Sequence, residues 1–373
     1  MANSIAPFFS DLPDTRSEHG KRHLLSDLVA IAVCAVVCGA ESWVDVSLFG
    51  RAKRAWFSTF LSLPHGIPSH DTFGRVFATL DPDHFERCFR AWTGALSGVI
   101  VGVVAVDGKT IRRSFDRAGK RAAIHMISAW ATDNRVVFGQ LAVASKTNEI
   151  TAIPKLLKML DIKGLTVTID AIGCQKAIAK QIVGQGGDYM LQVKANQPEL
   201  HEDIKQVFDK ALSRGWGRRG HDIHEQIEKG HGRIEKRRTH LTWDVPWLIK
   251  ASSDWRGLRG IVMVERERTV GESTTITRHY YITSLATRQA AEAARACRAH
   301  WGVENGLHWT LDVGFNEDQC RIREGYAAEN FARLRRIALN LLKAETTVKA
   351  GIKAKSKNAG WSHDYLLKVL GSG

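Results

Sequence analysis

The stretch VVAVDGKT at residues 103–110 decides the fold that this sequence predicts. It is an unbroken apolar run, mostly valine, that ends in one carboxylate and then a glycine. Such a run is typical of a buried strand, and the glycine after it is typical of a turn. We therefore expect a strand that carries Asp107 to its exposed carboxyl end and turns at Gly108.

A second stretch has the same form: LTVTID at residues 165–170, followed by Ala171 and Gly173. Either aspartate alone could be a turn residue or a helix cap, because Asp is common in both places. Two buried strands that each end in an aspartate can instead bring both carboxylates to one edge of a sheet. Carboxylate oxygens bind hard divalent cations, so the repeated pattern favours a metal site at Asp107 and Asp170.

The composition indicates a polyanionic partner. The chain has 373 residues, enough for two or three domains, and a formal net charge of +14. This charge suits nucleic acid or an anionic membrane surface. The charge-free runs between Asp27 and Glu41 and between Arg90 and Asp107 are too short to span a bilayer, and residues 1–10 do not resemble a signal peptide. We therefore expect a cytoplasmic protein that binds nucleic acid and no membrane.

The cysteines argue against a disulfide framework or a thiolate zinc site. The six cysteines contain no CxxC pair, and Cys34 and Cys38 lie one helical turn apart in an apolar segment. Cysteine in such a place usually acts as a small hydrophobe. The pattern fits a reducing cytosol.

Residues 1–95 are expected to form a helical domain. Apolar spacing near 3.6 residues, with turn signals between the runs, predicts helices at residues 24–39, 42–61, 70–80 and 83–96. Short helices with tight turns and several arginines could form a helix-turn-helix-like reader of DNA. The same pattern fits a helical bundle that supports dimerisation or packing, and both interpretations stay open here.

The hydrophobic period changes at Gly98, and we expect a second domain at residues 96–350. Strands and helices are predicted in the order β-β-β-α-β-α-β, at residues 99–107, 124–132, 136–145, 149–160, 165–170, 175–185 and 189–194. This is the order of a ribonuclease-H-like α/β core, in which the first and fourth strands lie side by side and each ends in an acid. The pair Asp133-Asn134 predicts a tight hairpin between the second and third strands.

A β-rich insertion is expected at about residues 215–285. A helix at residues 198–212 leads into a predicted loop at 214–232, which is rich in Gly, His and charge. Three alternating stretches then predict half-exposed antiparallel strands at residues 234–243, 261–268 and 275–284. A late helix follows from about residue 287 to 311, and a basic tail is expected at 351–373.

Four polar residues repeat every four positions on the late helix: His300, Glu304, His308 and Asp312. This spacing puts them on one helix face. They could form a zinc ligand set, because histidines and acids at such spacing share a helix face in zinc sites. Alternatively, Glu304 alone binds metal while the histidines contact phosphate or neighbouring groups. A merely solvated face is the third interpretation, which neighbouring apolar residues such as Trp301 argue against.

Three motifs resemble those of a bacterial insertion-sequence DDE transposase, in the group that includes the H-repeat-associated proteins. They are VDGKT at residues 106–110, TIDA with GCQK at 168–176, and HWGVEN at 300–305. The similarity continues through LHW, LDV and FNED at 307–318 and includes IPSHDTF at 67–73. It spans roughly residues 8–343, with the motifs in the same order and with similar flanks.

The resemblance implies a ribonuclease-H-like catalytic domain with a β-rich insertion and a metal triad of Asp107, Asp170 and Glu304. The implied enzyme binds transposon ends and catalyses metal-dependent cleavage and strand transfer on double-stranded DNA. The three carboxylates would hold two Mg²⁺ ions, with Mn²⁺ as a substitute, for in-line phosphoryl transfer. A homodimer in the active complex and a bacterial cytoplasmic location, on the nucleoid when DNA is bound, are implied as well.

Basic and polar residues near the acids are expected to contact DNA phosphates: Lys109, Arg112, Arg113, Lys194, Asn196, His300, Arg321 and Arg323. At least part of the basic region after the last acid should also be available to the DNA backbone; it includes Arg321, Arg323, Arg333, Arg335, Arg336 and Lys343. Related transposases carry Tyr, Arg and Lys where this chain has Cys297, His300 and Leu311. Of these three, only His300 can contact phosphate.

Three other functions are weighed against the transposase. A structure-selective ribonuclease-H-like nuclease would cleave DNA without joining it, and a non-catalytic DNA-binding regulator would do neither. Three intact acids argue against the regulator. A zinc hydrolase is the weakest alternative, because Mg²⁺ prefers acids to Cys or His.

Overall fold

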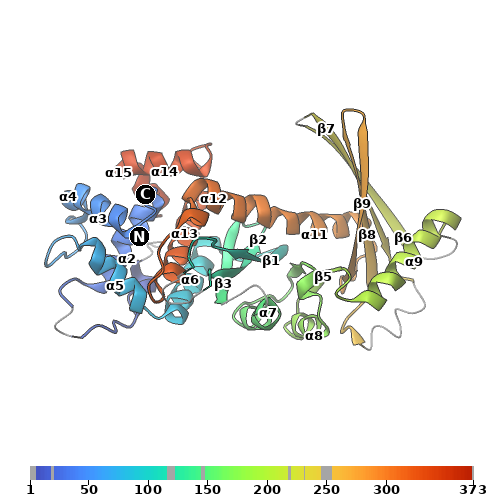
Figure 1. Ribbon diagram of the computed structural model, residues 1–373, viewed down its shortest axis with the longest axis horizontal. Coiled ribbons are helices and arrows are strands. Elements are labelled where there is room, and N and C mark those ends of the chain that lie inside the picture. The colour runs from blue at the N-terminus through green and yellow to red at the C-terminus, as the bar shows by residue number, and fades with distance from the viewer. Residues whose placement is uncertain are drawn as a thin grey trace. The chain divides into compact units, whose positions relative to one another are not determined.

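The computed structural model describes residues 6–17, 21–115, 122–143, 148–216, 220–230, 232–244 and 254–371 (Figure 1). It is an α/β structure with a large mixed sheet and a helical N-terminal region. The chain forms two compact units, of which unit 1 contains Met1–Ile100, Gly108–Asn148 and Glu304–Gly373. Unit 2 contains Val101–Asp107 and Glu149–Val303. The chain therefore passes between the units directly after Asp107 and directly before Glu304.

Unit 2 is built on a mixed sheet. Its strands lie in the order β1 (Val103–Thr110), β4 (Thr166–Ile169), β5 (Asp188–Val193), β9 (Ser273–Thr283), β8 (Gly260–Val270), β7 (Arg233–Thr242) and β6 (His221–Gly230). The first three strands are parallel, and each later pair is antiparallel. The predicted pairing of the first and fourth strands is confirmed, because β1 and β4 are neighbours. Both are apolar runs, as expected for strands buried on both faces of a sheet.

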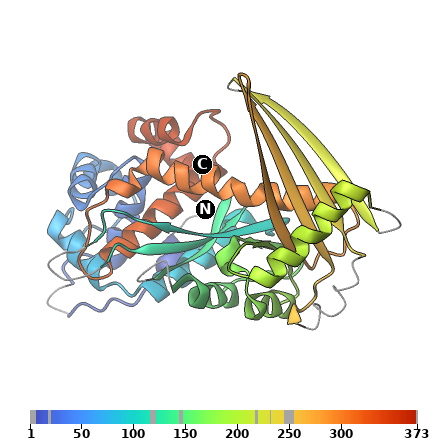
Figure 2. The same ribbon diagram turned by 45° about the vertical axis from the view of Figure 1, so that its right-hand side comes forward.

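Helices cover both faces of the parallel strands of unit 2 (Figures 1 and 2). α7 (Glu149–Lys158) and α8 (Lys176–Gly184) lie on one face, and α11 (Ala290–Val303) lies on the other. The core beneath α11 combines sheet residues such as Met190 and Val262 with small residues of the helix. Alanine on the inner face of α11 lets the helix backbone approach the sheet closely.

The insertion contains one strand more than predicted. The loop predicted at residues 214–232 is wrong, because β6 occupies His221–Gly230 and pairs with β7 along its whole length. β6 is the last strand of the sheet and half-exposed on both faces, so it lacks the apolar alternation that identifies strands. The other three predicted strands are confirmed as β7, β8 and β9, and the long strands are visible in Figure 2. The helix before them is α9 (Pro198–Arg214).

The first hundred residues of unit 1 are helical, as predicted: α1 (Ala6–Phe9), α2 (Leu25–Val37), α3 (Trp43–Ala52), α4 (Arg54–Phe57), α5 (His70–Thr79) and α6 (Pro82–Ser97). The helix predicted at residues 42–61 is divided at Lys53 into α3 and α4. Ser69 caps α5 as predicted, because its side chain accepts a hydrogen bond from the N–H of Thr72. These helices pack around α13 (Ala327–Ala344), which contacts α2, α5 and α6.

A hairpin of β2 (His125–Ala131) and β3 (Val136–Val143) also belongs to unit 1. Its turn contains the predicted Asp133-Asn134 pair. The side chain of Asn340 on α13 bonds both backbone groups of Val137, donating at 3.1 Å and accepting at 2.8 Å. These two bonds fix the hairpin to the central helix of the unit.

The late helix is not continuous, so the prediction for residues 287–311 is wrong in part. α11 is followed by a π-helical turn at Glu304–His308 and then by α12 (Trp309–Phe315). α11 also begins later than predicted, at Ala290, whose N–H donates to the Asp222 carboxylate of β6 at 2.7 Å.

The segment predicted as a basic tail contains two helices, α14 (Ile352–Trp361) and α15 (His363–Val369), which pack on α13. Lys355 of α14 is buried, and its ammonium donates to the carbonyl of Leu342 at 3.1 Å. Among the residues described, no helix is long and apolar enough to cross a membrane.

Three arginines of α13 are buried, so they are not the part of the later basic region that is available to DNA. Arg333, Arg335 and Arg336 are each at most 1% exposed. Arg333 pairs with Glu86 at 3.0 Å, and Arg336 pairs with Glu317 at 2.8 Å, with all four side chains buried. These cations therefore serve the core of unit 1.

Removing one partner of a buried ion pair should destabilise unit 1. In Glu317→Ala the guanidinium of Arg336 stays buried without its carboxylate, so we expect the free energy of unfolding to fall by about 3–5 kcal/mol. Urea denaturation measures the change. The double variant Glu317→Leu/Arg336→Met, which buries no charge at either position, should recover most of the loss. A single variant as stable as the wild-type chain would contradict the buried pair.

Candidate functional site

The two aspartates predicted as metal ligands stand at equivalent positions of neighbouring strands in unit 2. The β1–β4 register ends with the pair Val106↔Ile169, and each of these residues is followed directly by an aspartate, Asp107 or Asp170. Because the strands are parallel, both chains leave the sheet at the same edge. Both aspartates are half-buried there. The backbone register therefore brings two carboxylates to one sheet edge.

Asp170 also has a structural role. Its Oδ1 accepts a hydrogen bond from the N–H of Ile172 at 3.1 Å and caps a short 3₁₀ turn, Ala171–Gly173. The turn packs tightly on the strand, because a Cβ on Gly173 would lie 2.2 Å from Cγ2 of Ile169. One oxygen of Asp170 is thus used by the fold, and the direction of the carboxylate is fixed.

Residues after β5 hold the same turn from its other side. Asn196 donates from Nδ2 to the carbonyl of Ala171 at 2.6 Å, and Gln197 donates from Nε2 to the carbonyl of Cys174 at 2.9 Å. The amide of Asn196, expected at a phosphate, therefore contacts the backbone next to Asp170. Lys194, at the carboxyl end of β5, is exposed.

His300 joins α11 to the strand that carries Asp170. Its Nδ1 lies 3.2 Å from Oγ1 of Thr168, which is buried in β4 two residues before Asp170. The neighbouring Trp301 is 48% exposed, and its ring lies edge-on to His279 with 6.4 Å between the centroids. The last turn of α11 therefore carries one side chain fixed on the sheet and one large aromatic side chain open to solvent.

Glu304 and His308 are the first and last residues of the π-helical turn in unit 1. Nδ1 of His308 lies 3.5 Å from Oε2 of Glu304, and the side chains are 8% and 57% exposed, respectively. The acid is thus presented to solvent next to a buried imidazole. Both side chains offer an atom that could help to hold a metal ion: a carboxylate oxygen of Glu304 and a ring nitrogen of His308. π-Helical turns within α-helices are frequent at functional sites.

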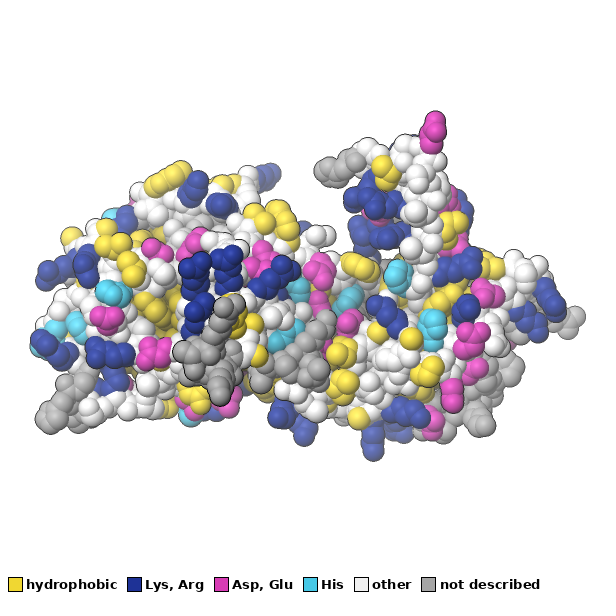
Figure 3. All heavy atoms as spheres, viewed as in Figure 1, with side chains coloured by type: hydrophobic (Ala, Val, Ile, Leu, Met, Phe, Trp, Pro, Cys, Tyr) yellow, Lys and Arg dark blue, Asp and Glu magenta, His cyan; other side chains and the backbone are white. Residues whose placement is uncertain are grey.

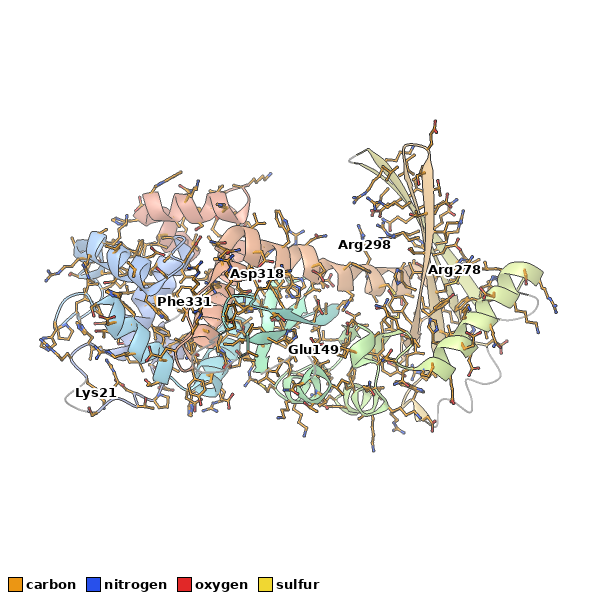
Figure 4. The ribbon with its side chains drawn as sticks, viewed as in Figure 1. Lys21, Glu149, Arg278, Arg298, Asp318 and Phe331 are labelled. Atoms are coloured by element: carbon orange, nitrogen blue, oxygen red, sulfur yellow. The ribbon has the colours of Figure 1, made fainter. Side chains whose placement is uncertain are left out.

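Lys109 is surrounded by acids in unit 1. Its ammonium lies 2.8 Å from Oδ1 of Asp312 and 3.1 Å from Oδ1 of Asp318, and its side chain is only 10% exposed. Asp318 is labelled in Figure 4. The two carboxylates compensate this cation, and the cluster ties the end of β1 to α12. Arg112 also contacts Asp318, at 3.3 Å, yet its side chain is 81% exposed.

A basic surface of unit 1 combines residues from two of the predicted DNA-contact segments. Arg323 donates from Nε to the carbonyl of Arg113 at 3.4 Å, and its guanidinium carbon lies 5.1 Å from the centroid of the Phe115 ring. Arg113 and Arg321 are exposed. Segments some two hundred residues apart in the sequence thus meet in one cationic patch.

One face of the β6–β9 sheet in unit 2 carries an excess of arginine, as the dark blue spheres over these strands indicate in Figure 3. We call it the arginine face and define it by Arg233, Arg237, Arg266 and Arg268. Arg237 and Arg266 are directly opposite each other on neighbouring strands, an unfavourable pairing for like charges. Arg237 pairs with Glu228 at 2.8 Å, whereas Arg266 has no carboxylate partner among the described residues.

The opposite face of the same strands is electrically balanced. Glu225, Arg238, Glu265 and Arg278 form one row across β6, β7, β8 and β9, with successive ion pairs of 2.9, 3.0 and 2.9 Å. Arg278 is labelled in Figure 4. The arginine face is not among the predicted DNA contacts, although the run ERERT at residues 265–269 contains its signal. The sequence alone does not show which of these alternating charges share a face, because that depends on how all four strands pair.

His279 borders the arginine face. Burial lowers the pKa of this imidazole, and the positive charges of Arg266 and Lys194 lower it further. Nδ1 of His279 also lies 3.2 Å from Nε2 of Gln192 on β5. The imidazole is therefore kept neutral, while its cationic neighbours extend the positive potential from β8 to the carboxyl end of β5.

Comparison with known proteins finds relatives along nearly the whole chain. The family described as "Transposase DDE domain" matches residues 102–341, and the one described as "DDE_Tnp_1-associated" matches residues 6–93. The chain is 42% identical over 372 residues to "H repeat-associated putative transposase YhhI" of Escherichia coli, which covers 98% of this chain and 97% of that protein. It is 39% identical over 376 residues to "Putative transposase YncI" of Escherichia coli, covering 99% and 95%.

Among solved structures, a cryo-EM structure of the piggyBac transposase synaptic complex with hairpin DNA aligns with 95% of this chain and 80% of that chain. The sequence identity is 9% and the TM-score is 0.39, which is too low for a conclusion about a common fold.

The acidic surroundings of Lys109 predict a stability difference between two neighbouring cations. Lys109→Met leaves two carboxylates without their shared cation, so we expect the free energy of unfolding to fall by about 2 kcal/mol. Arg112→Met is the matched control, because this exposed side chain should change stability by only about 0.5 kcal/mol. Urea denaturation compares them, and equal effects of the two substitutions would contradict the structural role of Lys109.

Proposed function

The chain belongs to the family of DDE transposases, and we propose that Asp107, Asp170 and Glu304 are the metal-binding acids of its active site. It is thus an enzyme that cuts and joins DNA. The observation that carries the assignment is the register of β1 and β4, in which two aspartates follow paired residues. Glu304 is the third acid because it is exposed and begins a π-helical turn directly after α11.

DDE transposases are metal-dependent, and the donor set supports a hard cation. Three carboxylates offer the oxygen ligands that Mg²⁺ prefers, so we propose two Mg²⁺ ions, with Mn²⁺ as a substitute. When bound, such ions activate the attacking oxygen and stabilise the leaving oxygen of an in-line displacement at phosphorus. Asp170 can contribute Oδ2, because its bond to Ile172 uses Oδ1.

His300 and His308 are assigned positioning roles and no metal. Mg²⁺ disfavours imidazole relative to carboxylate and water. The bond between His300 and Thr168 holds the last turn of α11 on β4, and His308 lies beside Glu304. His300 stands where related transposases have a phosphate-binding arginine, so a DNA phosphate is its proposed second contact.

The DNA is proposed to follow exposed and half-buried cations of both units. In unit 1 these are Arg112, Arg113, Arg321 and Arg323. In unit 2 they are Lys194 and the arginine face. Lys109 and Asn196 serve this site indirectly, because one fixes the end of β1 and the other fixes the turn after Asp170.

The active complex is proposed to be a homodimer bound to transposon-end and target DNA on the bacterial nucleoid. A transposon has two ends. One subunit at each end would supply one set of the three proposed acids for each strand transfer. The salt-dependent attraction of a +14 chain to DNA would bring the protein to the nucleoid.

Loss of one acid tests the active site. Asp107→Asn removes an anionic ligand and preserves the shape of the side chain, so Mg²⁺-dependent cleavage of a duplex that carries the terminal repeat should disappear. DNA affinity without metal should stay unchanged. Asp203→Asn, at an exposed position of α9, is the matched control and should cleave like the wild-type enzyme. Normal cleavage by Asp107→Asn would refute the assignment.

Loss of one arginine tests the arginine face. Because each phosphate contact releases counterions, Arg266→Gln should reduce the slope of log affinity against log salt by about one. Lys180→Gln, at an exposed position of α8, removes the same charge and should leave the slope unchanged. Fluorescence anisotropy with end DNA measures both slopes. Identical slopes for the two variants would remove the arginine face from the interface.

A further inference from the structure

The π-helical turn that carries Glu304 lies against a buried tryptophan of the β2–β3 hairpin, within unit 1. Trp130 of β2 is 2% exposed. A Cβ built on Gly306, in the middle of the turn, would lie 3.1 Å from Cζ2 and 3.3 Å from Cε2 of this indole. Such distances are shorter than ordinary contacts between side chains, so the turn backbone touches the ring edge directly. A methyl group at Gly306 would therefore have to move the turn or the ring by a few tenths of an ångström.

The indole is poorly able to give way. Trp130 follows a register shift of the β2–β3 ladder at Ala129, and the hairpin is fixed to α13 through Asn340. The ammonium of Lys343, also on α13, lies 5.2 Å from the centroid of the Trp130 ring. A cation over an indole ring adds to the packing that holds the ring in place. A new methyl group at position 306 would therefore displace the turn more than the tryptophan.

The turn is also fixed from its own side chains. Thr310, 7% exposed, donates from Oγ1 to the carbonyl of Asn305 at 3.1 Å and so satisfies a carbonyl of the widened turn. Leu311, on the helix that follows, is fully buried. Because the end of the turn is fixed in this way, a displacement at Gly306 also moves Glu304, which lies two residues earlier.

We propose that Trp130 and Gly306 are positioning residues that set the direction of the Glu304 carboxylate. The inference rests on the proposed function, in which Glu304 binds the catalytic metal. One residue more or less in a helical turn rotates the residues on its two sides by about 100° relative to each other, so the π-helical turn sets how Glu304 stands relative to α12. The indole is the surface against which this turn is seated.

The test substitutes the glycine and then makes room for the change. In Gly306→Ala, DNA cleavage should be slower by about tenfold or more, since misplacement of a catalytic group by ~1 Å can cost about 100-fold. The Mg²⁺ concentration for half-maximal rate should rise, and DNA affinity without metal should stay unchanged. Adding Trp130→Phe removes the contacting atoms of the larger ring, so the double variant should regain most of the lost rate. A merely structural role, in which the clash only destabilises unit 1, predicts the same rescue but no shift in Mg²⁺ dependence.

Gly302→Ala is the matched control, because a Cβ at Gly302 would meet no atom within 4 Å. It should cleave like the wild-type enzyme. Normal cleavage and normal Mg²⁺ dependence of Gly306→Ala would overturn the inference, and so would a loss that Trp130→Phe does not relieve. The Asp107→Asn variant distinguishes a failure of the positioning role from a failure of the proposed metal site. If that variant is inactive while Gly306→Ala is normal, only the positioning role fails; if it is active, the metal site itself is misassigned.

Discussion

The parallel pairing of β1 with β4 is the constraint on which the position of the two strand-end aspartates depends. Backbone hydrogen bonds fix the relative position of two strands to within one residue, and a slip by one residue would turn every side chain to the other face. Burial of both strands makes such a slip costly. Asp107 and Asp170 therefore stand at equivalent strand ends because the backbone pairing of the sheet places them there. The fold thus places two carboxylates at one sheet edge, where a bound cation could neutralise them.

Positive charge is distributed in the opposite way, and the net charge of +14 does not reveal where it acts. Arg333 and Arg336 are neutralised inside unit 1, because a buried guanidinium needs a carboxylate partner. Lys109 is neutralised at the end of β1. One face of the insertion is balanced row by row, and the other keeps an excess at Arg266. Cations that stabilise the fold and cations available to a polyanion differ in their surroundings, and residue type alone cannot distinguish them.

This difference explains which features could be predicted from the sequence. β1 and β4 are recognisable because their signals are local: an apolar run, a carboxylate and a turn. The cap at Ser69 is local in the same sense. β6 escapes prediction because an edge strand with two half-exposed faces needs no apolar alternation, and its pairing with β7 becomes apparent only in three dimensions. Arg333 looks like a DNA contact because its burial beside Glu86, which lies far away in the sequence, becomes apparent only in the folded chain; its second partner, Glu329, would pair with it equally on an exposed helix. The amino-acid composition gives no signal from which the π-helical turn could be predicted.

Two of the three proposed acids stand where the chain crosses between its compact units: Asp107 directly before the second of four crossings and Glu304 directly after the fourth. Each of these two crossings is anchored within two residues, and both anchors lie in unit 1. Lys109 is held by carboxylates of α12 and the following turn, and Gly306 is seated on Trp130. α12 continues directly from the π-helical turn, so the Lys109–Asp312 pair ties the end of β1 to the helix that Glu304 precedes. The two acid-bearing crossings are thereby joined through contacts inside one unit, although about two hundred residues separate them along the chain.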